Sequence, residues 1–252
     1  MPTMRHAAAF ASLIAIGLAS VAVGHAATRP AIDAAVADPA RPKADTDLDA
    51  ARHPAELLAF ADIKPGDRII DVFPGPYWDR LFADVVGPGG AVTMFIPAEV
   101  VKINEAPDVP NGSHPMPDHP NVTTMTAPIM SLAVERPADI VWIRQNYHDL
   151  YDPFMGPADV PAFNRLVFKA LRPGGRYVII DHAAPAGTGI ASTNTTHRID
   201  PARVKADLAA AGFVFVRETD VLANPADDHS KLVFNPAVRG HTDQFVYLFR
   251  KP

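Results

Sequence analysis

Short apolar runs alternate with helical stretches along most of this chain, and the turns between them contain Gly and Pro. Runs of strand length occur at residues 68–73, 91–96, 122–126, 139–143, 176–180, 213–217 and 244–249. Helical patterns precede the first run and separate several others, at residues 54–60, 77–86, 161–171 and 201–211. Strands that are joined through helices run parallel, and the helices then cover both faces of the sheet. The pattern therefore predicts an α/β fold built on one sheet.

The last two apolar runs differ from the others because only a loop, residues 220–242, separates them. Successive strands without a crossover helix pair most simply in antiparallel fashion. The sequence thus predicts a doubly wound, Rossmann-like seven-stranded sheet, mostly parallel with an antiparallel last strand. Residues 48–252 show no internal repeat and no second set of elements, so we expect a single domain there.

Residues 1–26 have the layout of a secretory signal peptide. Arg5 precedes the uncharged apolar run 7–23, and small residues follow it. We expect export, cleavage after Ala26 or one residue later, a periplasmic location and no stable membrane insertion after cleavage. A retained membrane anchor is the alternative, because the run approaches the length that spans a bilayer. Residues 27–47 are rich in Ala, Pro and Asp without a sustained period and predict a flexible tether.

Charge and cysteine content exclude several classes of function. The 23 basic and 28 acidic side chains give a net charge of -5, which offers no electrostatic footprint for nucleic acid. The sequence contains no cysteine, so disulfides, thiolate nucleophiles, iron–sulfur clusters and Cys-based zinc sites are excluded. We therefore expect no nucleic-acid partner.

Polar residues follow three of the apolar runs, at the point where each predicted strand ends. Asp71 lies near the end of the first run and the turn 73–77 comes after it; residues 145–149 follow the fourth run, and Asp181 and His182 follow the fifth. In an open doubly wound sheet, ligands bind outside the carboxyl ends of the strands, where the strand order reverses. We therefore expect these residues to line a ligand site.

Several separated motifs resemble those of a known family. A strand ending at Asp71 and a Gly/Pro turn are followed by Leu-Arg-Pro-Gly-Gly at 171–175 and by Ala-Gly-Phe at 211–213. This order resembles the class I S-adenosylmethionine-dependent methyltransferase fold. Over residues 51–252 the chain more narrowly resembles a family of exported bacterial predicted methyltransferases. The segments that carry this resemblance are Gln-Asn-Tyr-His-Asp at 145–149, Asp-His-Ala-Ala at 181–184, His-Arg-Ile-Asp at 197–200, Asp-Asp-His at 227–229 and Thr-Asp-Gln-Phe at 242–245.

The resemblance implies S-adenosylmethionine as the cofactor and a small molecule or a protein, of unknown identity, as the methyl acceptor. It places the cofactor against the turn after the first strand. The residues expected to contact the cofactor are Asp71, Phe73, Gly75, Tyr77, Glu99, Gln145 and Asn146. The catalytic candidates are His148, Asp181 and His182. A neutral imidazole near its pKa can take a proton at neutral pH, which makes His148 a candidate base.

Two features depart from the family pattern of Asp, two residues, Pro, three Gly and Tyr. The turn after Asp71 is one residue shorter, has the single Gly75, and contains Pro76, which lacks an N–H that could face a ligand. Ile96 stands where an acid usually contacts the ribose hydroxyls of the cofactor, and Glu99 is the nearby substitute. Both changes weaken the case for ordinary cofactor binding.

Each candidate also has a structural interpretation: Asp71 could bond the following turn, and the polar residues of 145–149 could satisfy loop backbone. Histidines near carboxylates suit zinc, and the second half of the chain contains His148, His182, His197, His229 and His241. No two of them have the i, i+4 spacing of a helical metal motif, so the sequence assigns no metal site.

Three functions remain open from the sequence. The first is an S-adenosylmethionine-dependent methyltransferase that acts on an unknown acceptor outside the cytoplasm. The second is a non-catalytic, methyltransferase-like ligand-binding protein with a degenerate cofactor loop. The third is a metal-assisted enzyme that uses the His- and Asp-containing loops.

Overall fold

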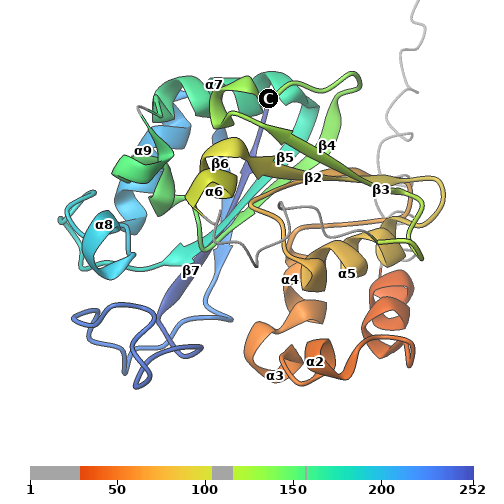
Figure 1. Ribbon diagram of the computed structural model, residues 1–252, viewed down its shortest axis with the longest axis horizontal. Coiled ribbons are helices and arrows are strands. Elements are labelled where there is room, and N and C mark those ends of the chain that lie inside the picture. The colour runs from red at the N-terminus through yellow and green to blue at the C-terminus, as the bar shows by residue number, and fades with distance from the viewer. Residues whose placement is uncertain (1–28, 104–115, 157) are drawn as a thin grey trace, which may run out of the picture.

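The computed structural model describes residues 29–103, 116–156 and 158–252. The predicted signal peptide, residues 1–26, lies outside them. The described chain forms a sheet with the strand order β3-β2-β1-β4-β5-β7-β6 (Figure 1). The strands are β1 (Arg68–Val72), β2 (Ala91–Pro97), β3 (Val122–Ala127), β4 (Ala138–Arg144), β5 (Leu171–His182), β6 (Val214–Thr219) and β7 (Gln244–Arg250).

The strand directions confirm the predicted fold class. β1 runs parallel to β2 and β4, β2 to β3, and β4 to β5. β7 is antiparallel to both of its neighbours, β5 and β6. The chain from β6 to β7 contains no helix and reverses direction through a loop, so β7 can lie between β5 and β6.

Helices cover both faces of the sheet (Figure 1). α4 and α5 lie on one face, and α7 and α9 on the other. Successive residues of a strand point to opposite faces, so Ile69 and Trp142 pack toward α4 and α5, whereas Ile70 and Ile143 pack toward α7 and α9. The helices are α2 (Lys43–Thr46), α3 (Asp49–Arg52), α4 (Pro54–Phe60), α5 (Pro76–Val86), α6 (Ala98–Ile103), α7 (Val160–Ala170), α8 (Thr193–Thr196) and α9 (Pro201–Ala210), with 3-10 turns η1 (Ile129–Ser131), η2 (His148–Tyr151) and η3 (Pro153–Met155).

Residues 29–47 do not form the flexible tether that the sequence predicted. Residues 29–37 are helical. Ile32 and Ala35 are buried in the same hydrophobic cluster as α4 and α5, and Val36 packs against that cluster. These three residues have the i, i+3, i+4 spacing of one helix face, which the frequent Ala, Asp and Pro residues obscure in the sequence.

Ion pairs hold the residues that follow this helix against α3 and α5. Arg41 pairs with Asp49 at 2.7 Å, and its side chain is nearly inaccessible to solvent. Asp45 pairs with Arg80 of α5, also at 2.7 Å. The N-terminal helices are therefore a packed part of the domain and lie beside the start of α5.

None of the helices in the described part of the chain is long and apolar enough to cross a membrane.

Candidate functional site

The strand order reverses between β1 and β4, and the carboxyl ends of β1, β4 and β5 lie side by side. Asp71 is in register with Trp142 of β4, and Arg144 with Ile180 of β5. This register brings Asp71, Arg144 and Asp181 to one edge of the sheet. The edge is where doubly wound sheets bind ligands.

Asp71 forms a buried carboxyl pair with Asp79 of α5, and their exposed fractions are 3% and 0%. Burial raises the pKa of Asp71 well above its usual range and the Asp79 carboxyl raises it further, while Arg144 and the Gly75 N–H oppose the rise. Burial also raises the pKa of Asp79 to about 7, although Asp71 and the Gly75 N–H lower it. Two adjacent buried carboxyls do not both ionise readily, so the pair retains a proton near neutral pH.

Arg144, at the end of β4, is a cation that the sequence analysis did not select. Burial lowers its pKa to about 10, with a further contribution from Arg52 and opposing contributions from Asp71 and Asp181. The guanidinium is therefore charged at neutral pH. Its Nε is buried without a hydrogen-bond partner among the described residues. The sequence does contain a signal for Arg144, because this cation directly follows the apolar run 139–143.

The turn after β1 keeps space beside Gly75. Phe73 has a left-handed φ of 59°, and its N–H donates to the carbonyl of Phe95 at 3.1 Å. Gly75 precedes the first residue of α5 and is half-buried, and a Cβ added to it would meet no other atom within 4 Å. Glycine lets a ligand approach the backbone closely, and the backbone at Gly75 is open to such an approach.

Tyr77 is engaged by the N-terminal helices. Its hydroxyl donates to Asp49 Oδ1 at 2.6 Å, and the Arg52 guanidinium lies 4.3 Å from the centre of its ring. The side chain is buried, and burial raises the pKa of the hydroxyl, with Asp49 adding to the rise. In this arrangement the hydroxyl serves the packing of the N-terminal helices.

Glu99, the expected substitute for the ribose-binding acid, lies in the first turn of α6. Its two carboxylate oxygens accept from the backbone N–H of Ile129 at 3.0 and 3.2 Å. This bond ties α6 to the segment after β3. Ile96, the residue before the last of β2, is a buried apolar residue.

Gln145 and Asn146 lie at the edge between β4 and η2. Gln145 has a left-handed φ of 59°, and its Nε2 donates to Oε1 of Gln244, the first residue of β7, at 2.9 Å. Asn146 Nδ2 donates to Asp149 Oδ2 at 2.7 Å. Both side chains are half-buried and bonded to other polar side chains of the same edge.

Asp181 organises the catalytic candidates. It is fully buried at the end of β5. Its Oδ2 accepts from the backbone N–H of His148, and its Oδ1 contacts His148 Nδ1, both at 2.8 Å. The same Oδ1 accepts from the His182 N–H, and His182 Nδ1 bonds the Thr242 hydroxyl at 2.7 Å. The structure thus brings all three catalytic candidates together.

His197 joins this group from a distant part of the sequence. A parallel bridge between Ala183 and Ile199 lays its segment against the end of β5. The fully buried Arg198 fixes that segment by donating to the Ala183 carbonyl and pairing with Asp227 at 2.9 Å. His197 Nδ1 then lies 3.1 Å from His148 Nε2.

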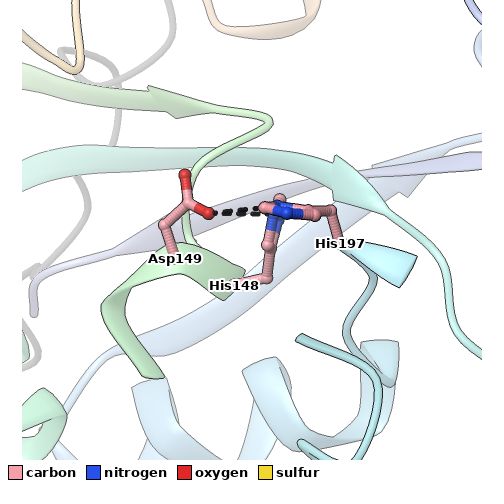
Figure 2. A group of neighbouring side chains, drawn as sticks. All are labelled: His148, Asp149 and His197. Atoms are coloured by element: carbon pink, nitrogen blue, oxygen red, sulfur yellow. Dashed lines mark hydrogen bonds and ion pairs between the residues drawn. The ribbon is translucent and has the colours of Figure 1, made fainter. Parts of the chain in front are cut away.

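Asp149 and the two histidines bring three nitrogen and oxygen atoms close together (Figure 2). Its Oδ1 is 3.1 Å from His148 Nε2 and 3.5 Å from His197 Nδ1. Spacing within the sequence could not identify this group, because His148 and Asp149 lie 49 and 48 residues before His197.

His148 of η2 and His182 at the end of β5 are both buried, but their pKa values are shifted in opposite directions. Burial lowers the pKa of His148, but the carboxylates of Asp181 and Asp149 outweigh it and raise the pKa to about 10. Burial and the neighbouring cations, His148 first, hold the pKa of His182 well below its usual range. His148 therefore carries a proton at neutral pH and is a poor base there, whereas His182 is neutral.

Comparison with known proteins gives similarity of fold. No protein-family model matches the sequence, and no curated protein matches it. The N-methyltransferase NodS of Bradyrhizobium japonicum WM9 superposes with a TM-score of 0.53 at 13% identity, over 82% of this chain and 98% of NodS. An S-adenosylmethionine-dependent methyltransferase of Mesorhizobium loti gives 0.53 at 14% identity, over 81% and 100%. The [4+2]-cyclase SpnF gives 0.52 at 20% identity, over 83% and 82%.

These similarities agree with the strand order and with the single antiparallel strand at the end of the chain. At sequence identities of 13–20%, these similarities establish the fold, and the activity depends on the residues of the site. The chain has the class I S-adenosylmethionine-dependent methyltransferase fold.

Proposed function

We propose that this protein is an S-adenosylmethionine-dependent methyltransferase that binds its cofactor over the carboxyl ends of β1 and β4. The observation that carries the proposal is the convergence of Asp71, Arg144 and the open side of Gly75 at the strand-order reversal. The methyltransferase neighbours support it as relatives in fold.

The residues at this edge fit the amino-acid end of the cofactor. The charged, buried guanidinium of Arg144 has an unpartnered Nε and would take the carboxylate of the methionine moiety. The Asp71 carboxyl would accept from its ammonium group. The space beside Gly75 would let the cofactor approach the backbone.

Methyl transfer requires little from the protein beyond alignment and a destination for one proton. When bound, the cofactor would supply a methyl group on a sulfonium sulfur for transfer to the acceptor, with S-adenosylhomocysteine as the leaving group. We place the acceptor on the β5 side, beside Asp181 and His182. His148 already carries a proton, so the neutral His182, although burial makes it a weak base, is the histidine that could take the proton of the acceptor.

Calorimetric titration with S-adenosylmethionine and S-adenosylhomocysteine tests the proposal. We expect binding in the micromolar range, about -8 kcal/mol, and its loss in Asp71→Asn. Asp139→Asn is the matched control. Asp139 is also a strand aspartate, but it lies at the start of β4, far from the proposed site, where it accepts from the Arg68 N–H and from Arg172 Nε. No heat and no thermal stabilisation at millimolar ligand would rule out the methyltransferase.

A ligand-binding protein of the same fold is the second candidate, and two observations favour it. Glu99 is bonded to Ile129, and Tyr77 to Asp49, so two expected cofactor contacts are already used within the fold. A neighbour described as a cyclase also shows that this architecture accompanies other activities. Binding of another ligand at Asp71 and Arg144, without affinity for S-adenosylmethionine, would favour this candidate.

We also propose that the protein acts outside the cytoplasm, on the support of Arg5, the apolar run 7–23 and the small residues after it. The resemblance to an exported bacterial family gives the same expectation. Mass spectrometry of the protein from a periplasmic fraction should find an N-terminus near residue 27. An intact N-terminus in the membrane fraction would instead indicate a retained anchor.

A further inference from the structure

Three side-chain atoms that can ligate a metal converge beside the end of β5. They are His148 Nε2, His197 Nδ1 and Asp149 Oδ1, and Figure 2 shows them directed at one another. Their separations are 3.1, 3.1 and 3.5 Å. Zinc bonds of about 2.0–2.1 Å in a tetrahedral arrangement separate neighbouring ligand atoms by about 3.3–3.4 Å. The three atoms are therefore already spaced as ligands of one ion.

A single hydrogen on His148 does not satisfy this group. Asp181 occupies Nδ1 of His148, so that nitrogen carries a hydrogen and Nε2 faces the other two atoms. A single hydrogen on Nε2 can point at His197 Nδ1 or at Asp149 Oδ1, but not at both. Asp149 Oδ1 is buried and has no hydrogen bond of good geometry among the described residues. A cation at the centre of the three atoms would satisfy all of them.

The surroundings of these atoms are those of a built site. A carboxylate that accepts from the second nitrogen of a ligating histidine fixes the tautomer and the ring orientation, and Asp181 has this position relative to His148. Asn146 holds the other oxygen of Asp149. Arg198, fully buried, fixes the segment that carries His197.

We propose that His148, Asp149 and His197 form a binding site for a divalent cation of the zinc class. Two imidazoles and one carboxylate suit zinc and its neighbours in the first transition row. Three protein ligands leave a fourth position of a tetrahedral ion for water or a substrate atom, as in catalytic rather than structural zinc sites. The His197 side chain is 26% exposed and gives the site its contact with solvent.

The test uses Zn²⁺ and Co²⁺ alone, with tag-free protein that has been stripped with a chelator. We expect one Zn²⁺ per chain after reloading, a higher thermal midpoint, and a visible Co²⁺ spectrum of tetrahedral type. His197→Ala should weaken Zn²⁺ binding by at least about tenfold and abolish the spectrum, and Asp149→Asn should do the same. Asp149→Asn keeps the test decisive if His197→Ala folds poorly.

His229→Ala is the matched control. His229 also pairs with a carboxylate, Asp243 at 3.0 Å, but this pair is not part of a group of three such ligands in the described chain. Its variant should bind Zn²⁺ like the wild type. Substoichiometric Zn²⁺ in the wild type, or full binding by both His197→Ala and Asp149→Asn, would overturn the proposal.

This site does not rest on the proposed methyltransferase activity. The Zn²⁺ titration needs no S-adenosylmethionine, and the cofactor titration is run on chelator-treated protein with Asp71→Asn as its variant. A negative result in one titration therefore does not affect the conclusion drawn from the other.

Discussion

Asp71 and Asp79 place two carboxyl groups in a buried position where at most one ionises easily. Burial is the main cause of both raised pKa values, and Arg144 and the Gly75 N–H limit the effect on Asp71. A shared proton leaves the pair with about one negative charge, which Arg144 can balance. The pair is therefore suited to hold a ligand that carries both an ammonium group and a carboxylate.

The raised pKa of Asp79 predicts a dependence of stability on pH. Its folded pKa of about 7 lies above the unfolded value of about 3.9. The folded protein therefore binds this proton more tightly, and the associated stability is complete below about pH 4 and is lost as the pH rises through 7. Asp79→Asn cannot ionise, so its thermal midpoint should exceed that of the wild type at pH 8 by about 2 °C or more, and by less at pH 5.

Thermal melts followed by circular dichroism at pH 5 and pH 8 measure this difference. The exposed residue Asp220 provides the control variant Asp220→Asn, which should show the same small change at both values. An equal shift of Asp79→Asn at pH 5 and pH 8 would show that the carboxyl does not titrate between them.

Individual site residues could be predicted where a polar residue ends an apolar run. Asp71, Asp181 and His182 were selected in this way and lie near the ends of β1 and β5, as expected. His148 was also found, but its charge depends on Asp181 and Asp149, which only the folded chain places on its two ring nitrogens. No spacing in the sequence connects His197 with these residues.

Arg144 and Asp79 illustrate a second reason for missed residues. Arg144 is the last residue of β4 and follows the predicted run 139–143, so the sequence analysis did not select it, although it interacts electrostatically with Asp71. Asp79 lies in an amphipathic helix, where an acid is ordinarily exposed, but it is fully buried. Burial of a charged side chain depends on tertiary contacts that local periodicity does not contain.

The helix over residues 29–37 and the short helices α2 and α3 build one wall of the region around α5. Through Asp49 and Arg52 they hold Tyr77, which the sequence analysis assigned to the cofactor. The N-terminal helices thus determine how much of α5 remains accessible at the candidate site.

Burial of Ile32 predicts that this helix contributes to stability. The side chain is 0% exposed within the α4–α5 cluster, so Ile32→Ala should lower the free energy of unfolding by about 2–5 kcal/mol. Ala34→Ser, at an exposed position of the same helix, is the control and should change it by about 0.5 kcal/mol or less. Urea unfolding of both variants measures the difference. Equal free energies of unfolding for Ile32→Ala and Ala34→Ser would show that residues 29–37 are not packed and behave as a flexible tether.

The strands were predicted more accurately than this helix. The runs of the central strands are bounded by Gly, Pro or polar residues and are too apolar to lie outside a core, so their place in the sheet follows. The antiparallel β7 was also predictable, because the chain before it has no crossover helix. Helix 29–37 has a narrow apolar face of small residues, and its burial depends on α4 and α5.

The whole molecule places two polar groups along one edge of the sheet. Asp71, Arg144 and Gly75 lie at β1 and β4, and the His148–Asp149–His197 group lies beside β5. The first is proposed to hold a methyl donor and the second a divalent cation. In this proposal the acceptor lies on the β5 side, beside Asp181 and His182 and next to the proposed cation site.

A crystal structure of the protein grown with S-adenosylhomocysteine tests the central claim most directly. The account predicts the ligand over the carboxyl ends of β1 and β4, with its amino-acid carboxylate at Arg144 and its ammonium at Asp71. A ligand bound elsewhere on the sheet, or a structure free of ligand at saturating concentration, would contradict the assignment of this edge as a methyl-donor site.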